Sequence, residues 1–357
     1  MKHVAIVAGV FGGAVAVLGF TTGRPDSDPA RYAVHSAVER TSDQDTITEV
    51  SMRNVNFYLM PNGALRIRKM RGTMRSLKGG SVVFDDKNSF IMHLTYAEIG
   101  LNGTDITTLM NKYIFAYPGA PLKRLQVHMS GSQIVQTGVM HKILDIPFKI
   151  TADVSVTTEG LIRLHPVKTT ILGVDGGKLM RAFGLSLQKI LDPSKANGVT
   201  VKGNDLFLDP VRILPPPAIE GHATAIRVDG DQLVQTFGTE AESTPLPPPD
   251  TSASAYMFFK GGTLHFGKLL MLDAEMQIVD LRPTGFFNFE LDKYKDQLVA
   301  GYERTLPSLG LEVYMLGLEK LATGKATTAE LPRYLARSLG EYAVRKTAAQ
   351  AALRQKH

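Results

Sequence analysis

Ser186 and Lys189 have the S-x-x-K spacing that penicillin-binding proteins and β-lactamases use for a nucleophilic serine. No K-T-G segment follows, and the tetrad lies inside an amphipathic helical pattern, so we interpret the match as chance. The G-x-S-x-G and H-E-x-x-H motifs are absent as well. The sequence therefore identifies no catalytic residue and favours a protein that is not an enzyme.

The sequence also offers no clear candidate residues for binding a metal or a cofactor. The chain contains no cysteine, which excludes thiol nucleophiles, disulfides and thiolate metal sites. Glycines near the N-terminus read G-x-x-G-G, which is not the G-x-G-x-x-G spacing of a dinucleotide-binding loop. Lone histidines are usually surface or core groups, and six of the nine stand singly in strand-like or turn contexts: His93, His128, His141, His165, His222 and His265. We predict neither a metal nor a cofactor.

Basic residues give a stronger signal, because six of them fall within thirteen positions that contain no acid: Arg66, Arg68, Lys69, Arg71, Arg75 and Lys78. A nucleic-acid groove would alternate such charges with exposed aromatic side chains, and this segment has none, so we predict no nucleic-acid partner. Two interpretations remain, contact with anionic lipid and a solvated edge strand. The first five residues of the cluster are our candidates for contact with a membrane surface.

Strands dominate the predicted secondary structure. Ile150, Ala152, Val154 and Val156 alternate with polar residues, a period of two that puts one face of a strand on a core and the other in water. Turn residues interrupt such runs at hairpin spacing, at positions 159–160, 204–205, 229–230 and 261–262. These patterns predict an α+β, β-dominated fold with antiparallel sheet.

Helical periodicity is confined to a few segments, near 104–117, 175–191, 292–302 and 328–353. The first helix follows a capping Thr104 or Asp105. The apolar faces of the first two helices either belong to the core or line a groove for acyl chains. The candidate groove residues are Ile106, Leu109, Tyr113, Leu179, Phe183 and Leu187.

Differences in composition divide the chain into several segments. Seventeen consecutive uncharged residues, Val4–Phe20, predict a signal peptide or N-terminal membrane anchor over 1–23, and hence export to the periplasm or anchoring at the inner membrane. A polar tether follows over 24–45. The remaining predicted parts are a β-rich domain over 46–238, a proline-rich linker or loop over 239–254, a β-rich extension over 255–318 that completes the same sheet, and a basic amphipathic helix over 326–355.

The order of elements between Pro147 and Gly238 is distinctive: an alternating strand, a turn at 159–160, a second strand, the helix 177–191, then Val199–Val201 and Asn204–Leu208. This layout resembles the LmeA-like family of bacterial envelope phospholipid-binding proteins, within the tubular lipid-binding (TULIP) group. The resemblance covers about Ile47 to Gly238. It implies a long curved antiparallel sheet wrapped around one or two amphipathic helices. Residues 261–302 resemble the C-terminal part of uncharacterised exported bacterial proteins, which implies no function.

Three functions stay open on these grounds. The first is non-enzymatic binding or transfer of phospholipid or another acyl-chain lipid, which requires an apolar cavity. The second is a membrane-anchored structural or interaction protein, which requires a closed core. The third is a hydrolase whose serine, histidine and acid come together only in the folded chain.

Overall fold

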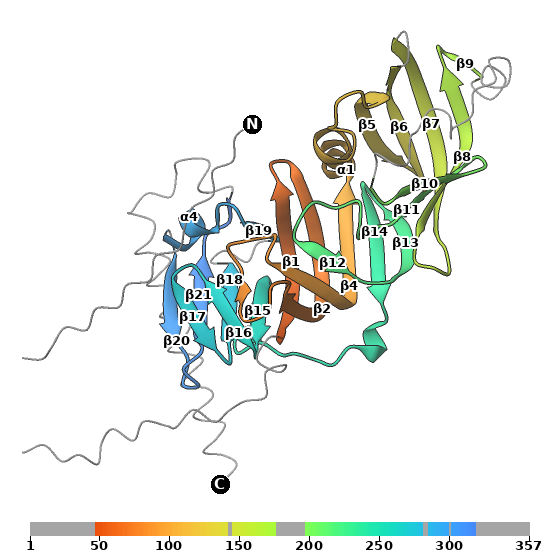
Figure 1. The fold of residues 1–357 in the computed structure, drawn as a ribbon. Helices are drawn as coiled ribbons and strands as arrows, with labels where there is room; N and C mark the ends of the chain where they lie inside the picture. The colour runs from red at the N-terminus through yellow and green to blue at the C-terminus, as the bar shows by residue number, and fades with distance from the viewer. Residues whose placement is uncertain (1–46, 142–144, 176–196, 281–284, 300, 319–357) are drawn as a thin grey trace, which may run out of the picture. The chain divides into compact units, whose positions relative to one another are not determined.

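The computed structural model describes residues 47–141, 145–175, 197–280, 285–299 and 301–318, which form three β-sheets and few helices (Figure 1). This confirms the predicted β-dominated architecture, in which most neighbouring strands are antiparallel. The predicted signal or anchor segment, the tether and the C-terminal helix lie outside the described residues, as does the helix predicted over 177–191.

The largest sheet contains eleven strands, which are β1 Ile47–Met60, β2 Gly63–Ser76, β4 Phe90–Asn102, β12 Ala218–Glu220, β13 Ala223–Asp229, β14 Gln232–Gly238, β15 Tyr256–Lys260, β18 Glu275–Asp280, β19 Phe287–Glu290, β20 Tyr302–Thr305 and β21 Leu311–Met315. Its order is β13-β14-β4-β2-β1-β15-β18-β21-β20, with β12 beside β4 and β19 beside β1. Because β15 pairs with β1, residues 255–318 add strands to the same sheet.

A seven-stranded antiparallel sheet contains β5 Leu122–Ser130, β6 Gln133–His141, β7 Asp145–Val156, β8 Ile162–Ile171, β9 Val174–Asp175, β10 Val199–Lys202 and β11 Asp205–Leu208. Its order is β10-β11-β8-β7-β6-β5, with β9 beside β8. The turns predicted at 159–160 and 204–205 join β7 to β8 and β10 to β11. A small third sheet consists of β3 Val82–Val83, β16 Thr263–Phe266 and β17 Leu269–Leu272.

The main core lies on one face of the eleven-stranded sheet. In β1 the buried apolar positions change parity, from Val50 and Met52 to Val55 and Phe57. Asn54 lies between the two series with a φ of 51°, in the left-handed region that asparagine tolerates. At the same place β1 changes its second neighbour from β15 to β19. Asn54 thus allows one strand to serve two partners while both halves keep their apolar side chains inward.

The proline-rich segment 239–254 connects β14 with β15 and contains the short 3-10 helix η4 Glu240–Glu242. Leu246 and Ala253 within it are buried and pack with Phe258 of β15 and Val279 of β18. Gln277 fixes the segment further, because its side-chain oxygen accepts the amide of residue 250 at 2.7 Å. The predicted loop is therefore in contact with the sheet.

The described helices are short: α1 Gly103–Leu109, the π-helix η3 Met110–Ile114 and α4 Tyr294–Val299. The first helix was predicted to follow a cap at Thr104 or Asp105, which is wrong by two or three residues. β4 remains extended to Asn102, and this residue is the cap. Its Oδ1 accepts from the Asp105 amide at 2.8 Å, and Asp105 Oδ2 accepts from the Asn102 amide at 3.0 Å, a capping box.

Asp105 also joins α1 to the eleven-stranded sheet. Its carboxylate is almost fully buried and accepts the Ala64 amide at 3.1 Å and Arg66 Nε at 3.1 Å, both from β2. Two residues further along α1, Thr107 Oγ1 accepts the Val127 amide of β5 at 2.9 Å. One short helical segment therefore holds a strand from each of the two large sheets.

We predict that Asp105→Ala lowers the free energy of unfolding by about 2–4 kcal/mol, because it leaves the buried Ala64 amide and the Arg66 guanidinium without their acceptor. Chemical denaturation measures the loss. Asp231→Ala, at an exposed turn position, is the matched control and should stay within about 0.5 kcal/mol of the parent. Equal effects of the two substitutions would contradict this role of Asp105.

Candidate functional site

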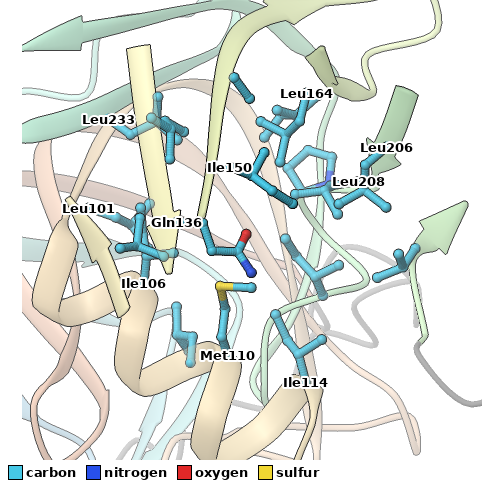
Figure 2. A pocket seen from close by; sticks show the side chains of 18 of the residues that line it. Leu101, Ile106, Met110, Ile114, Gln136, Ile150, Leu164, Leu206, Leu208 and Leu233 are labelled. Carbon is cyan, nitrogen blue, oxygen red and sulfur yellow. The ribbon is translucent and has the colours of Figure 1, made fainter. Parts of the chain in front are cut away.

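An apolar cavity of about 200 Å³ is lined by the α1–η3 segment and by strands of both large sheets (Figure 2). Protein interiors are close-packed, and voids larger than one water molecule are few. This cavity is therefore larger than ordinary packing leaves. Most of its lining consists of aliphatic side chains, among them Leu101, Ile106, Met110, Ile114, Ile150, Leu164, Leu206, Leu208 and Leu233.

The seven-stranded sheet contributes its inward positions at a period of two. On β7 the lining residues are Phe148, Ile150 and Ala152, whereas Lys149 and Asp153 between and beside them are exposed. This is the alternation that predicted one apolar face for the segment. Here that face borders the cavity.

The helical segment is held in place by hydrogen bonds to the adjacent strand. The Asn111 side chain donates to the Leu125 carbonyl at 2.7 Å and accepts the Leu125 amide at 3.0 Å. Gly103 approaches the same strand so closely that a Cβ atom there would lie 2.3 Å from the Val127 carbonyl oxygen. Ile106 and Leu109 consequently face the cavity.

The six candidate groove residues have different placements. Ile106 and Leu109 line the cavity, while Tyr113 does not and is 41% exposed. The reason is the π-helical turn that begins at Met110, because its wider winding moves the next inward position from Tyr113 to Ile114. Leu179, Phe183 and Leu187 lie outside the described residues. Lipid contact by any of these residues stays a prediction.

Most of the cavity wall was not among the predicted groove residues. The groove was predicted between sheet and helices, but all of its candidate residues came from helices. The described lining comes mainly from strands such as β8, with Ile162 and Leu164, and β11, with Leu206 and Leu208. Strand alternation was the available signal, and it identifies an inward face without telling whether core or cavity lies beyond it.

The chemistry of the lining is nearly uniform. Among the described lining residues none is charged, and none is serine or histidine. The polar ones are Gln136, Thr169, Asn204 and Gln235. In the described ranges no group of three or more histidine, aspartate or glutamate side chains is placed to hold a metal ion. The arrangement is suited to enclosing an apolar molecule and directing a few hydrogen bonds to it.

Five of the six residues of the basic cluster lie on β2, and Lys78 follows it. The edge-strand interpretation is wrong, because β2 pairs with β1 on one side and β4 on the other. Four of the five candidate residues instead pair with carboxylates, and Arg71 donates to Ser51 Oγ. The four pairs are Arg66–Asp105 at 3.1 Å, Arg68–Asp229 at 2.8 Å, Arg75–Glu220 at 3.4 Å and Lys69–Glu240. Much of this charge is thus compensated within the fold, and contact with a membrane surface stays a prediction.

An ion-pair cluster on the outer side of the cavity wall joins β11 to β8. Asp205 accepts from Arg163 Nε at 2.7 Å and lies 2.6 Å from His165 Nδ1. The hydrogen bond with His165, together with that from Arg163, holds the pKa of the Asp205 carboxyl below its usual 3.8. The next residue, Leu206, lines the cavity, so this cluster helps to fix the wall.

Comparisons of the chain with known protein families, with curated proteins and with solved structures found no match. In the part of the chain that the structure describes, none of the helices has the length and apolarity needed to cross a membrane.

The ion-pair cluster predicts a pH dependence of stability. Because the folded-state pKa of Asp205 is lowered, its contribution is present above the unfolded-state value and is lost as the pH falls through the folded-state pKa. Asp205→Asn should therefore lower the free energy of unfolding at neutral pH, and the gap to the parent should narrow as the pH falls below about 4. Urea denaturation across the pH range measures this. A gap that stays constant down to about pH 2 would contradict it.

Proposed function

We propose that this protein binds or transfers phospholipid, or another acyl-chain lipid, in the bacterial cell envelope without catalysing a reaction. The observation that carries the proposal is the apolar cavity of about 200 Å³ between the helical segment and the two large sheets. Apolar cavities of on the order of 150 Å³ already take up small hydrocarbons such as benzene.

The energetics favour an acyl chain as the occupant. Each CH₂ group moved from water into apolar surroundings contributes about 0.8 kcal/mol, so a chain of several such groups gives substantial affinity without any charged contact. The aliphatic lining supplies those surroundings from several elements at once. Met110 and Met140 add flexible side chains, which adapt to chains of different shape.

The same proposal includes a TULIP-like fold for the protein. A TULIP-like arrangement, in which a long curved sheet wraps around one or two amphipathic helices, would place a lipid groove between sheet and helix. The lining of the cavity by both α1 and the inner positions of β6 to β8 supports such a relation. Export, with retention in the periplasm or at the inner membrane, would bring the protein to its lipid.

A second candidate is a structural or interaction protein of the envelope. It is favoured by the exposed leucines of β17, where Leu270 is 54% and Leu272 is 73% exposed. Exposed apolar groups on a strand at the edge of its sheet are suited to contact with another protein. This candidate gives no role to the cavity, so we place it second.

The lipid proposal is tested with vesicles that contain phosphatidylglycerol bearing a pyrene-labelled acyl chain. Removal of labelled lipid by the protein lowers the pyrene excimer signal. Leu164→Trp should weaken this uptake at least about tenfold, because the larger side chain of a cavity residue occupies space that the acyl chain needs.

Val167→Trp is the matched control, since Val167 belongs to the same strand, is 48% exposed and does not line the cavity. It should take up lipid as the parent does. The absence of uptake by the parent protein, or equal uptake by a folded Leu164→Trp variant, would overturn the proposal.

A further inference from the structure

Two glutamines interrupt the apolar inward faces of the cavity walls. Gln136 follows Ile134 by two positions on β6, and Gln235 follows Leu233 by two positions on β14. Ile134 and Leu233 pack in one apolar cluster, although they belong to different sheets. The two glutamines therefore line the cavity from different sheets, each near a residue of the same cluster. Figure 2 shows the Gln136 amide among the labelled aliphatic side chains.

Neither amide is explained by the packing of the protein. Gln235 is only 9% exposed, and in the described part of the chain neither glutamine side chain has a hydrogen-bond partner. An amide buried in apolar surroundings destabilises the fold unless it is hydrogen-bonded. A leucine at either position would avoid that penalty at similar size. Gln235 is such a buried group, and Gln136, which is partly buried, lines the same cavity without a partner. This arrangement indicates that a bound molecule supplies the partner.

The lining restricts the chemistry of that partner. No described lining residue carries a charge, so a carboxylate or phosphate inside the cavity would meet no cation there. The NH₂ group of a glutamine donates to an uncharged acceptor such as a carbonyl oxygen. In an acyl-chain lipid, the uncharged acceptor next to the chain is the ester carbonyl.

We propose that Gln136 and Gln235 bind the ester carbonyl of an acyl chain, so that the cavity selects esterified chains over free fatty acids and leaves any charged headgroup outside. This inference rests on the proposed function and deepens it, since it assigns the selectivity to two residues. The ester can belong to a phospholipid or to a neutral glycerolipid, because both present the same group.

Three probes with the same chain length test the selectivity: methyl oleate, oleate and an octadecene hydrocarbon. Each is titrated against the full chain at about pH 8, where oleate is ionised, by displacement of the apolar dye phenylnaphthylamine. Methyl oleate should bind about three- to tenfold more tightly than the hydrocarbon, the range expected for one net hydrogen bond. Oleate should bind at least about tenfold more weakly than the ester.

Gln136→Leu and Gln235→Leu should each reduce the ratio of ester affinity to hydrocarbon affinity. Thr137→Leu is the control, because Thr137 neighbours Gln136 and does not line the cavity. Phosphatidylcholine and dioleoylglycerol, offered separately in cyclodextrin, distinguish the two sources of the ester.

The outcomes separate the two proposals. If the hydrocarbon and the ester bind equally to the parent, or if both leucine variants keep the full preference, the glutamine inference is overturned while the lipid cavity stands. If neither the dye nor any of the three probes binds, the cavity takes up no lipid and both proposals fail.

Discussion

The hydrogen bonds of one short helical segment determine where the cavity lies. Asp105 joins α1 to β2 of the eleven-stranded sheet, while Thr107 and Asn111 join the same segment to β5 of the seven-stranded sheet. In each of these bonds a side chain of the segment meets a main-chain group of a strand, so the segment is tied to the backbone of both sheets. The segment occupies only part of the space between the sheets, and inward apolar positions of several strands therefore border a cavity instead of a closed core.

The two large sheets therefore have different roles in the fold. The main core packs against the eleven-stranded sheet and includes aromatic pairs such as Phe84–Phe259 and Phe57–Phe289, at 5.3 and 5.6 Å between ring centroids. It supplies stability by ordinary burial. The seven-stranded sheet directs much of its inward face to the cavity, where an acyl chain would complete the apolar contacts. Four polar side chains interrupt the otherwise apolar lining of the cavity: Gln136, Thr169, Asn204 and Gln235.

The sequence predicted the class of fold because strand alternation and turn residues are local signals. The alternating residues 150–156 lie in β7, and the turns at 159–160 and 204–205 join strands as expected. The residues of the candidate site were harder to predict from the sequence. Tyr113 fits an α-helical face with Ile106, but the chain forms a π-helical turn from Met110 to Ile114, and Ile114 lines the cavity in place of Tyr113. No sequence pattern predicted that turn. The basic residues of β2 were assigned to an edge or a membrane because their partners, such as Asp105, Asp229 and Glu240, come from other parts of the chain. Pairing between distant elements has no local signature.

The central claim is that the cavity binds an acyl-chain lipid. Native mass spectrometry of the full chain, produced in a bacterial host and purified without detergent, tests it most directly when combined with analysis of the extracted lipid. The account predicts protein carrying esterified lipid at a fixed stoichiometry, and loss of that lipid from the folded Leu164→Trp variant. A stable, monodisperse protein that carries no lipid and takes none up from vesicles would contradict it.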